Sequence, residues 1–192
     1  MRDAVKYWTL RIVSVIAISV LALAAYLGFQ QYTGNFHPVV AGEVYRSAQM
    51  KGSQLSDYTA EVGLKSVLNL RGAAPGEDWY EAEVSESARL GLTHADFALS
   101  ASREVTNEEA VQLIALMRSL PKPMLIHCKQ GADRTGLLAA LYLASIKGVD
   151  VDTADDALSL AYGHFSVPYL SAAYPMDESW NRLEVALNLP QK

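Results

Sequence analysis

The stretch HCKQGADRTG, from His127 to Gly136, contains the only cysteine of the 192-residue chain. Cys128 follows a short apolar run, and Gly131 and Arg134 come shortly after it, before a second apolar run. A glycine-containing loop between a strand and a helix directs backbone N–H groups and the positive end of the helix dipole at an anion. The same field favours the ionised, nucleophilic form of a thiol. The stretch therefore predicts a phosphate site with a reactive cysteine in it.

The side chains of this loop are suited to different parts of a phosphoryl transfer. Cys128 would attack phosphorus, and the planar fork of Arg134 would bind two phosphate oxygens. Thr135 would donate a hydrogen bond to the sulfur and stabilise it as a leaving group, and His127 would orient the loop. The G-x-x-x-x-G-K-[ST] pattern of nucleotide-binding loops is absent, and no histidine or carboxylate set has metal-ligand spacing, so neither cofactor nor metal is expected.

The pattern H-C-x5-R-T resembles the signature loop of the cysteine-dependent protein tyrosine and dual-specificity phosphatases. In element order the resemblance extends from Glu43 to about Ser166. It implies hydrolysis in two steps without a metal, in which a cysteinyl-phosphate forms and water then cleaves it. It also implies that Cys128 is the nucleophile and Arg134 the phosphate-binding arginine. The implied cradle of backbone amides comprises Lys129, Gln130, Gly131, Ala132, Asp133 and Arg134.

The general acid departs from the family pattern. Compact members carry an aspartate just beyond a strand that precedes a capped helix, but the corresponding loop here, residues 100–104, has none. Asp96 is available but falls inside the expected strand, where it could be a structural carboxylate. Asp133 is the other candidate, since its D-R-T ending resembles the loops of the myotubularin and Sac phosphoinositide phosphatases. Asp133 could instead orient Arg134, and Glu104 is the third candidate.

Several other polar residues lie where they could serve the loop. Arg46 and Arg71 end two expected strands on the side where the loop begins, so both are expected to brace it. Lys129 resembles a basic residue of lipid-directed members and could contact a further anionic group. His164 follows an expected helix near a possible pocket wall, although a core or surface histidine is the simpler interpretation. His94 has no evident partner in the sequence.

The segments around the loop alternate between strand-like and helix-like patterns. A capping box at Thr106–Glu109 marks one helix start. Such alternation predicts an α/β fold, a central and mostly parallel sheet flanked by helices, of the tyrosine/dual-specificity phosphatase kind. Expected strands are residues 43–46, 65–70, 93–99 and 124–127, and expected helices are residues 53–63, 78–90, 106–120, 137–146, 154–163 and 177–189.

The N-terminal segment is apolar and uncharged from Ile12 to Phe29, just long enough to span a bilayer as one helix. A signal peptide is the alternative, because Ala22-Leu23-Ala24 resembles a cleavage site, but the apolar run continues beyond it. Basic residues precede the segment and none follows until Arg46, which predicts a cytoplasmic N-terminus and a periplasmic or extracytoplasmic domain. The chain is then similar to a bacterial-type, membrane-anchored phosphatase. Its expected parts are a basic flank, a transmembrane anchor, a linker and a phosphatase domain: residues 1–11, 12–29, 30–41 and 42–192.

Charge and cysteine content exclude two classes of function. Residues 30–192 carry 13 basic and 20 acidic side chains, because three basic and one acidic of the chain's 16 and 21 precede them. A net charge of −7 disfavours nucleic-acid binding. A thiol redox protein would need a resolving cysteine, which is absent.

The sequence thus predicts a phosphomonoester hydrolase with a cysteinyl-phosphate intermediate. Its substrates would be phosphotyrosine or dual-specificity protein substrates, or membrane phospholipid phosphates. The alternative is a catalytically weak pseudophosphatase that binds phosphorylated partners without turnover.

Overall fold

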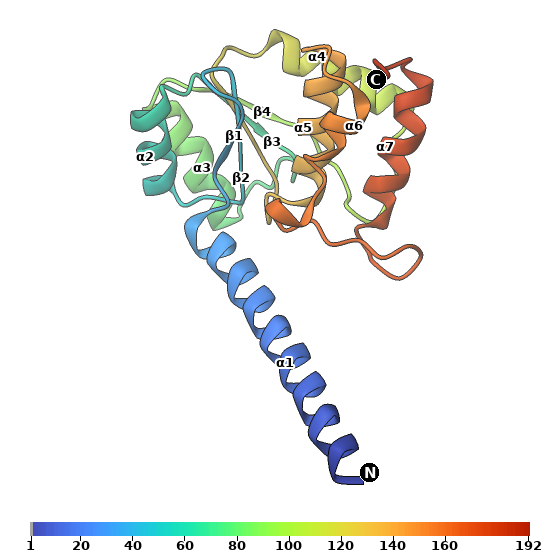
Figure 1. Cartoon of the computed structure of the whole chain (residues 1–192). Coiled ribbons are helices and arrows are strands. Elements are labelled where there is room, and N and C mark those ends of the chain that lie inside the picture. The colour runs from blue at the N-terminus through green and yellow to red at the C-terminus, as the bar shows by residue number, and fades with distance from the viewer. Residues whose placement is uncertain (1) are drawn as a thin grey trace. The chain divides into compact units, whose positions relative to one another are not determined.

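The structure is a computed structural model that describes residues 2–192, and the chain divides into two units after Thr33. The first unit is a single helix, α1 (Arg2–Thr33), drawn in blue in Figure 1. Its residues Lys6–Thr33 are long and apolar enough to cross a membrane, by length and composition. The helix is longer than residues 12–29 and takes up the start of the expected linker. It ends where Gly34 adopts a left-handed backbone (φ +82°), a common helix stop.

The second unit is built on a five-stranded sheet in the order β1-β2-β5-β3-β4. All neighbouring strands are parallel except β1 and β2, which confirms the predicted, mostly parallel sheet. The prediction that residues 30–41 form a linker needs correction, because strand β1 lies within this segment. Pro38 hides this strand in the sequence, but proline is tolerated at a sheet edge, where β1 lies. The strands are β1 (His37–Val40), β2 (Val44–Ser47), β3 (Ser66–Asn69), β4 (Thr93–Asp96) and β5 (Met124–His127).

The helices of the domain largely match the expected segments. The capping box of α4 is present, because Thr106 Oγ1 accepts a bond from Glu109 N at 3.1 Å and Glu109 Oε2 accepts one from Thr106 N at 2.8 Å. The helix expected over residues 154–163 is instead interrupted where Ser159 takes an extended backbone. The elements are α2 (Gly52–Val62), α3 (Asp78–Arg89), α4 (Asn107–Ser119), α5 (Asp133–Ser145), α6 (Val151–Asp155), the 3-10 turn η1 (Leu160–Tyr162) and α7 (Tyr174–Ala186).

The two faces of the sheet are covered by different helices, α2 and α3 on one and α4 to α7 on the other (Figure 1). Successive strand residues point to opposite faces. Leu125 of β5 therefore packs in the core under α2 and α3, whereas Ile126 packs in the larger core with α5. Helix α5 is buried along most of its length, as its apolar sequence predicts. The β5–α5 connection, which contains Cys128, is thus held by the two most central elements.

Candidate active site

The loop from Cys128 to Asp133 joins the end of β5 to the first turn of α5. The carbonyls of its second and third residues are held by hydrogen bonds from the surrounding chain. Lys129 O accepts from Gln49 N at 3.2 Å, and Gln130 O accepts from Asn35 Nδ2 at 3.1 Å. Cys128 itself is buried, with 2% of its surface exposed.

The next two carbonyls are held by one buried guanidinium. Arg46 Nη2 donates to Gly131 O at 2.8 Å and to Ala132 O at 3.2 Å, while Nη1 donates to Ala157 O at 2.8 Å. The guanidinium also stacks on the ring of Tyr162, 4.0 Å from its centroid. In a trans peptide the N–H points opposite to the preceding carbonyl, so carbonyls held outward direct the following N–H groups into the loop. The loop is therefore an anion cradle.

Arg134 follows the loop, in the first turn of α5. Its Nη1 donates to Leu70 O at 3.1 Å and to Leu99 O at 3.0 Å. Its Nε is buried and has no hydrogen-bond partner among the described residues. One edge of the guanidinium is thus fixed by the backbone, and the other retains the two N–H groups that a phosphate accepts.

A buried carboxylate fixes the residue before the cysteine. Glu83 Oε1 accepts hydrogen bonds from His127 Nε2 at 3.0 Å and from His94 Nε2 at 2.8 Å, and Oε2 accepts one from Gln49 Nε2 at 2.6 Å. Burial raises the pKa of Glu83, but the charge and hydrogen bond of His127 and the bonds from His94 and Gln49 outweigh it and hold the pKa at about 2. His94 therefore has a partner, and His127 is oriented through its ring as well as its backbone. No motif in α3 indicates Glu83.

Arg71 is a further cation near the thiol. It donates to Gln49 Oε1 at 2.9 Å and stacks 3.4 Å from the centroid of the Trp79 ring. Burial and the nearby charge of Arg134 lower the pKa of Arg71, against the opposite effect of Glu83 and Cys128. Arg71 thus reaches the site through Gln49, and it adds positive charge beside the loop.

Of the three acid candidates, Asp133 lies in the loop itself. His164 Nδ1 donates to Asp133 Oδ1 at 2.8 Å, and His164 Nε2 donates to Asp177 Oδ2 at 3.2 Å. Burial lowers the pKa of His164, but the bonds and charges of the two aspartates outweigh it and raise the pKa above its ordinary value. A ring that donates from both nitrogens is an imidazolium, which is the form that the raised pKa of His164 favours. The sequence could place His164 near a pocket wall but could not predict these partners.

Asp96 ends β4, and β3 separates it from β5. Two strand spacings put it about 10 Å from the backbone of His127. Its Oδ1 accepts from Asn69 Nδ2 at 2.8 Å and its Oδ2 from Tyr80 Oη at 2.6 Å. The hydrogen bond to Asp96 is the main cause that raises the pKa of Tyr80 to about 12. Both carboxylate oxygens of Asp96 are therefore bound within the protein.

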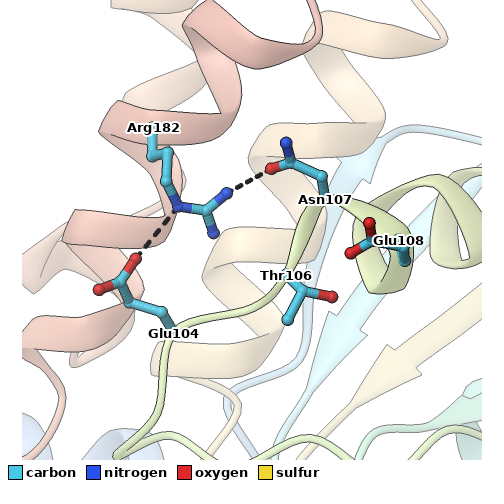
Figure 2. Close-up of a pocket in the computed structure, with 5 residues that line it drawn as sticks. All are labelled: Glu104, Thr106, Asn107, Glu108 and Arg182. Carbon is cyan, nitrogen blue, oxygen red and sulfur yellow. Dashed lines mark hydrogen bonds and ion pairs between the residues drawn. The ribbon is translucent and has the colours of Figure 1, made fainter.

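Glu104, the third acid candidate, lies in a different pocket of about 370 Å³ between the start of α4 and α7 (Figure 2). Its Oε2 accepts a bond from Arg182 Nε at 3.1 Å, and Arg182 also donates to Asn107 Oδ1. No residue of the cysteine loop lines this pocket in the described structure. Glu104 is thus engaged in a surface ion pair away from the cradle.

A pocket of about 380 Å³ opens beside the loop. Its lining includes Gln130 and Asp133 from the loop and, from elsewhere, Ala101, Ser102, Gly163, Phe165 and Ser171–Ala173. Thr135, expected to donate to the sulfur, is fully buried, and its hydroxyl has no hydrogen-bond partner among the described residues. The structure thus gathers Cys128, the loop amides, Arg46, Arg71 and Arg134 around one cradle with a pocket next to it.

A cysteine in an amide cradle with an arginine at its edge, on a mostly parallel sheet, defines the class of cysteine-dependent phosphatases. Residues 27–159 match the tyrosine phosphatase family (Y_phosphatase3), and the chain belongs to that family of hydrolases. Membership of this family makes the chain a cysteine-dependent phosphomonoesterase. No curated protein sequence matches the chain.

Solved structures share the fold at low sequence identity. TpbA of P. aeruginosa is 21% identical with a TM-score of 0.57, and the match covers 81% of this chain and 91% of that one. The core catalytic domain of the PP-IP phosphatase SIW14 of S. cerevisiae is 21% identical with a TM-score of 0.58, over 80% and 93%. A DUF442 protein of Shewanella putrefaciens is 15% identical with a TM-score of 0.60, over 80% and 90%.

Removal of the buried carboxylate should destabilise the domain. In Glu83→Ala, the donors of His94, His127 and Gln49 lose their acceptor, so we expect a loss of about 3 kcal/mol in the free energy of unfolding. The exposed Glu61 of α2 supplies the control, and Glu61→Ala should cost within about 0.5 kcal/mol. Since the depressed pKa keeps Glu83 ionised above pH 5, the difference should persist there and shrink only as the pH falls toward 2. Urea unfolding measures both, and equal losses would contradict this role.

A side chain at Gly131 should disrupt the cradle. Gly131 has a left-handed backbone (φ +70°), and a Cβ there would lie 2.5 Å from the carbonyl carbon of Ser47. Gly148 has a similar φ (+71°) but open space around it, so Gly148→Ala carries the backbone strain without the clash. We expect Gly131→Ala to lose most hydrolysis of p-nitrophenyl phosphate and Gly148→Ala to retain it. Equal activity of the two variants would show that the close approach to Ser47 is unimportant.

Proposed function

We propose that the chain is a membrane-anchored phosphomonoesterase in which Cys128 is the nucleophile, Arg134 binds the phosphate and Asp133 is the general acid. The observation that carries the proposal is the fixed cradle: four successive carbonyls, those of residues 129–132, are held outward, so the amides of residues 130–133 converge where a phosphate bound to Cys128 would lie. Arg46 and Arg71 support the cradle, and His127 positions its first residue through Glu83.

The reaction proceeds in two displacements at phosphorus. The Cys128 sulfur forms a bond to phosphorus as the ester P–O bond breaks, and Asp133 gives its proton to the leaving oxygen. Water then attacks the cysteinyl-phosphate, Asp133 takes a proton from this water, and the thiolate leaves as phosphate is released. The amides and the free edge of Arg134 bind the equatorial oxygens, whose charge they stabilise in both steps.

Asp133 is better placed than Asp96 for the acid role. Asp133 lines the pocket beside the cradle, and its bond to His164 uses only Oδ1. Asp96 is two strands away, and both its oxygens accept hydrogen bonds from the protein. The imidazolium of His164 is also a proton source in direct contact with Asp133. These observations support Asp133 as the donor and Asp96 as a structural residue.

The pocket supports a substrate with a single phosphate on an uncharged carrier. No lysine or arginine of the described chain lines it, and apart from Gln130 and Asp133 of the loop its walls are alanine, serine, glycine and Phe165. TpbA has been solved in complex with phosphotyrosine, whereas SIW14 is a PP-IP phosphatase. A polyphosphorylated ring would need more cations than this pocket offers. Phosphotyrosine in proteins and phosphate on lipids both meet the requirement.

The proposed topology is a single pass through the membrane with the N-terminus in the cytoplasm and the catalytic domain on the periplasmic or outer side. Helix α1 is long enough to span, and basic residues precede its apolar stretch. A domain on that side would meet phosphates of the outer leaflet and of exported proteins.

A phosphate-release panel tests the proposed function. The full chain in nanodiscs would be given a phosphotyrosine peptide, phosphatidylglycerophosphate and a polyphosphorylated phosphoinositide, with Cys128→Ser as the control. We expect release from the first two substrates, little from the third and none in Cys128→Ser. Release that survives in Cys128→Ser would refute the mechanism. Tight binding of phosphorylated ligand without release by the native chain would support the pseudophosphatase instead.

The acid assignment is tested by leaving groups. In Asp133→Asn, hydrolysis of an alkyl phosphate should fall by roughly 100-fold or more, whereas p-nitrophenyl phosphate, whose leaving group needs no proton, should be affected much less. Asp96→Asn is the matched control and should leave the ratio of the two rates unchanged. A selective loss on the alkyl phosphate in Asp96→Asn, with Asp133→Asn unaffected, would reverse the assignment.

A further inference from the structure

The segment between η1 and α7 has an unusual composition for this domain. Ala157 to Met176 is a run of 20 residues without Asp, Glu, Lys or Arg, whereas 19% of the chain is charged. About four charges would be expected in a run of that length. In the described part of the domain, two exposed large apolar side chains lie outside this segment, those of Val111 and Val185. The others all lie in this segment: Leu160, Phe165, Tyr169 and Leu170.

The most exposed of these side chains form the tip of a closed turn. Tyr169 and Leu170, called here the apolar tip, are 87% and 86% exposed. The turn is closed by bonds from Leu170 N and Ser171 N to Val167 O, at 3.1 and 2.9 Å. Tyr169 has a left-handed backbone (φ +61°), which is costly for a residue with a Cβ. The protein thus holds two large apolar side chains outward in a strained turn, visible as the loop that leads into α7 in Figure 1.

We propose that the apolar tip inserts into the surface of the bilayer that α1 spans. This inference rests on the proposed anchoring. The candidate membrane span runs to Thr33 and the domain begins at Gly34, so a bilayer is always within reach of the domain. Tyrosine and leucine side chains are stable at the boundary between headgroups and acyl chains.

The distribution of charged residues also favours this segment as the part of the domain that contacts lipid. The domain as a whole has a net charge of −7 from residue 30 onward, so most of its surface is repelled by anionic headgroups. The run from Ala157 to Met176 carries none of these acidic groups and can approach without that repulsion. His164 is its one titratable imidazole, and it is buried.

The contact would bring the substrate pocket to the lipid. Phe165 and Ser171–Ala173, on either side of the apolar tip, line the pocket that Asp133 also lines. A phosphate monoester on a lipid headgroup could then enter the cradle while its acyl chains remain in the bilayer. Insertion of the tip therefore favours lipid-borne phosphate as the substrate of this phosphatase.

The insertion can be measured without catalysis, because Cys128 is the only cysteine. In a Cys128→Ser background, a polarity-sensitive fluorophore would be attached through Leu170→Cys, Ser19→Cys in α1, or Val185→Cys. Val185 is 76% exposed near the far end of α7, about 16 Å along the helix from its start. The full chain is reconstituted in nanodiscs of phosphatidylethanolamine and phosphatidylglycerol, with and without brominated acyl chains.

We expect brominated lipid to quench the labels at positions 19 and 170 at least twofold and to leave the label at 185 unchanged. Quenching at 19 without quenching at 170 would overturn the inference, and so would equal quenching at 170 and 185. No quenching at 19 would refute the anchoring on which it rests. A blue shift at 170 that brominated lipid does not quench would indicate a protein contact instead, and would also overturn it.

Activity gives a second readout. The double substitution Tyr169→Ser and Leu170→Ser should lower hydrolysis of a lipid phosphate in nanodiscs about tenfold and leave hydrolysis of soluble p-nitrophenyl phosphate unchanged. Val185→Ser is the matched control and should change neither rate. An equal fall on both substrates would show a folding defect rather than loss of lipid contact, and would count against the inference. If native protein hydrolyses neither substrate, the proposed function fails, whereas the fluorophore measurement still decides the insertion.

Discussion

The buried guanidinium of Arg46 is the interaction on which the rest of the site depends. It is 1% exposed, and burial lowers its pKa to about 10, so it remains charged at neutral pH. Three carbonyls and the face of Tyr162 compensate that charge, and two of those carbonyls belong to the loop. A charge buried in this way cannot leave its partners without a large desolvation cost. The orientation of the loop peptides, and hence the direction of their N–H groups, follows from where β2 places this residue.

A second buried charge, of opposite sign, fixes the other side of the same loop. Glu83 comes from α3 and gathers three donors that belong to β4, β5 and the segment after β2. It ties the start of the loop to a helix on the face of the sheet opposite α5. The cradle is thus held between an arginine that anchors its carbonyls and a glutamate that anchors the ring of His127. The geometry of the cradle requires both residues, although neither needs to touch the substrate.

The sequence could predict what is local in the chain and not what the fold brings together. The β5–α5 connection was predictable, since an apolar strand, a Gly loop and an apolar helix are adjacent, with Cys128 in the loop and Arg134 in the first turn of the helix. Arg46 could be suspected because it ends a strand on the right side of the sheet. Glu83 could not, because a helical glutamate looks solvent-exposed until its three partners meet it. Strand β1 was concealed by Pro38, and the last helix expected before α7 is interrupted at Ser159, which takes an extended backbone.

The pairing of Asp133 with His164 resolves a difficulty that the sequence alone leaves open. A carboxylate inside an anion cradle weakens the attraction for phosphate, which argues against an acid at that position. His164 is held between Asp133 and Asp177, and its raised pKa favours a positive charge beside the loop. The negative charge of Asp133 is thereby offset before substrate binds. In the proposed assignment, the imidazolium of His164 is in contact with Asp133 and is a source for the proton that the leaving oxygen needs. An acid in the loop is therefore compatible with the cradle only because a histidine from a distant segment accompanies it.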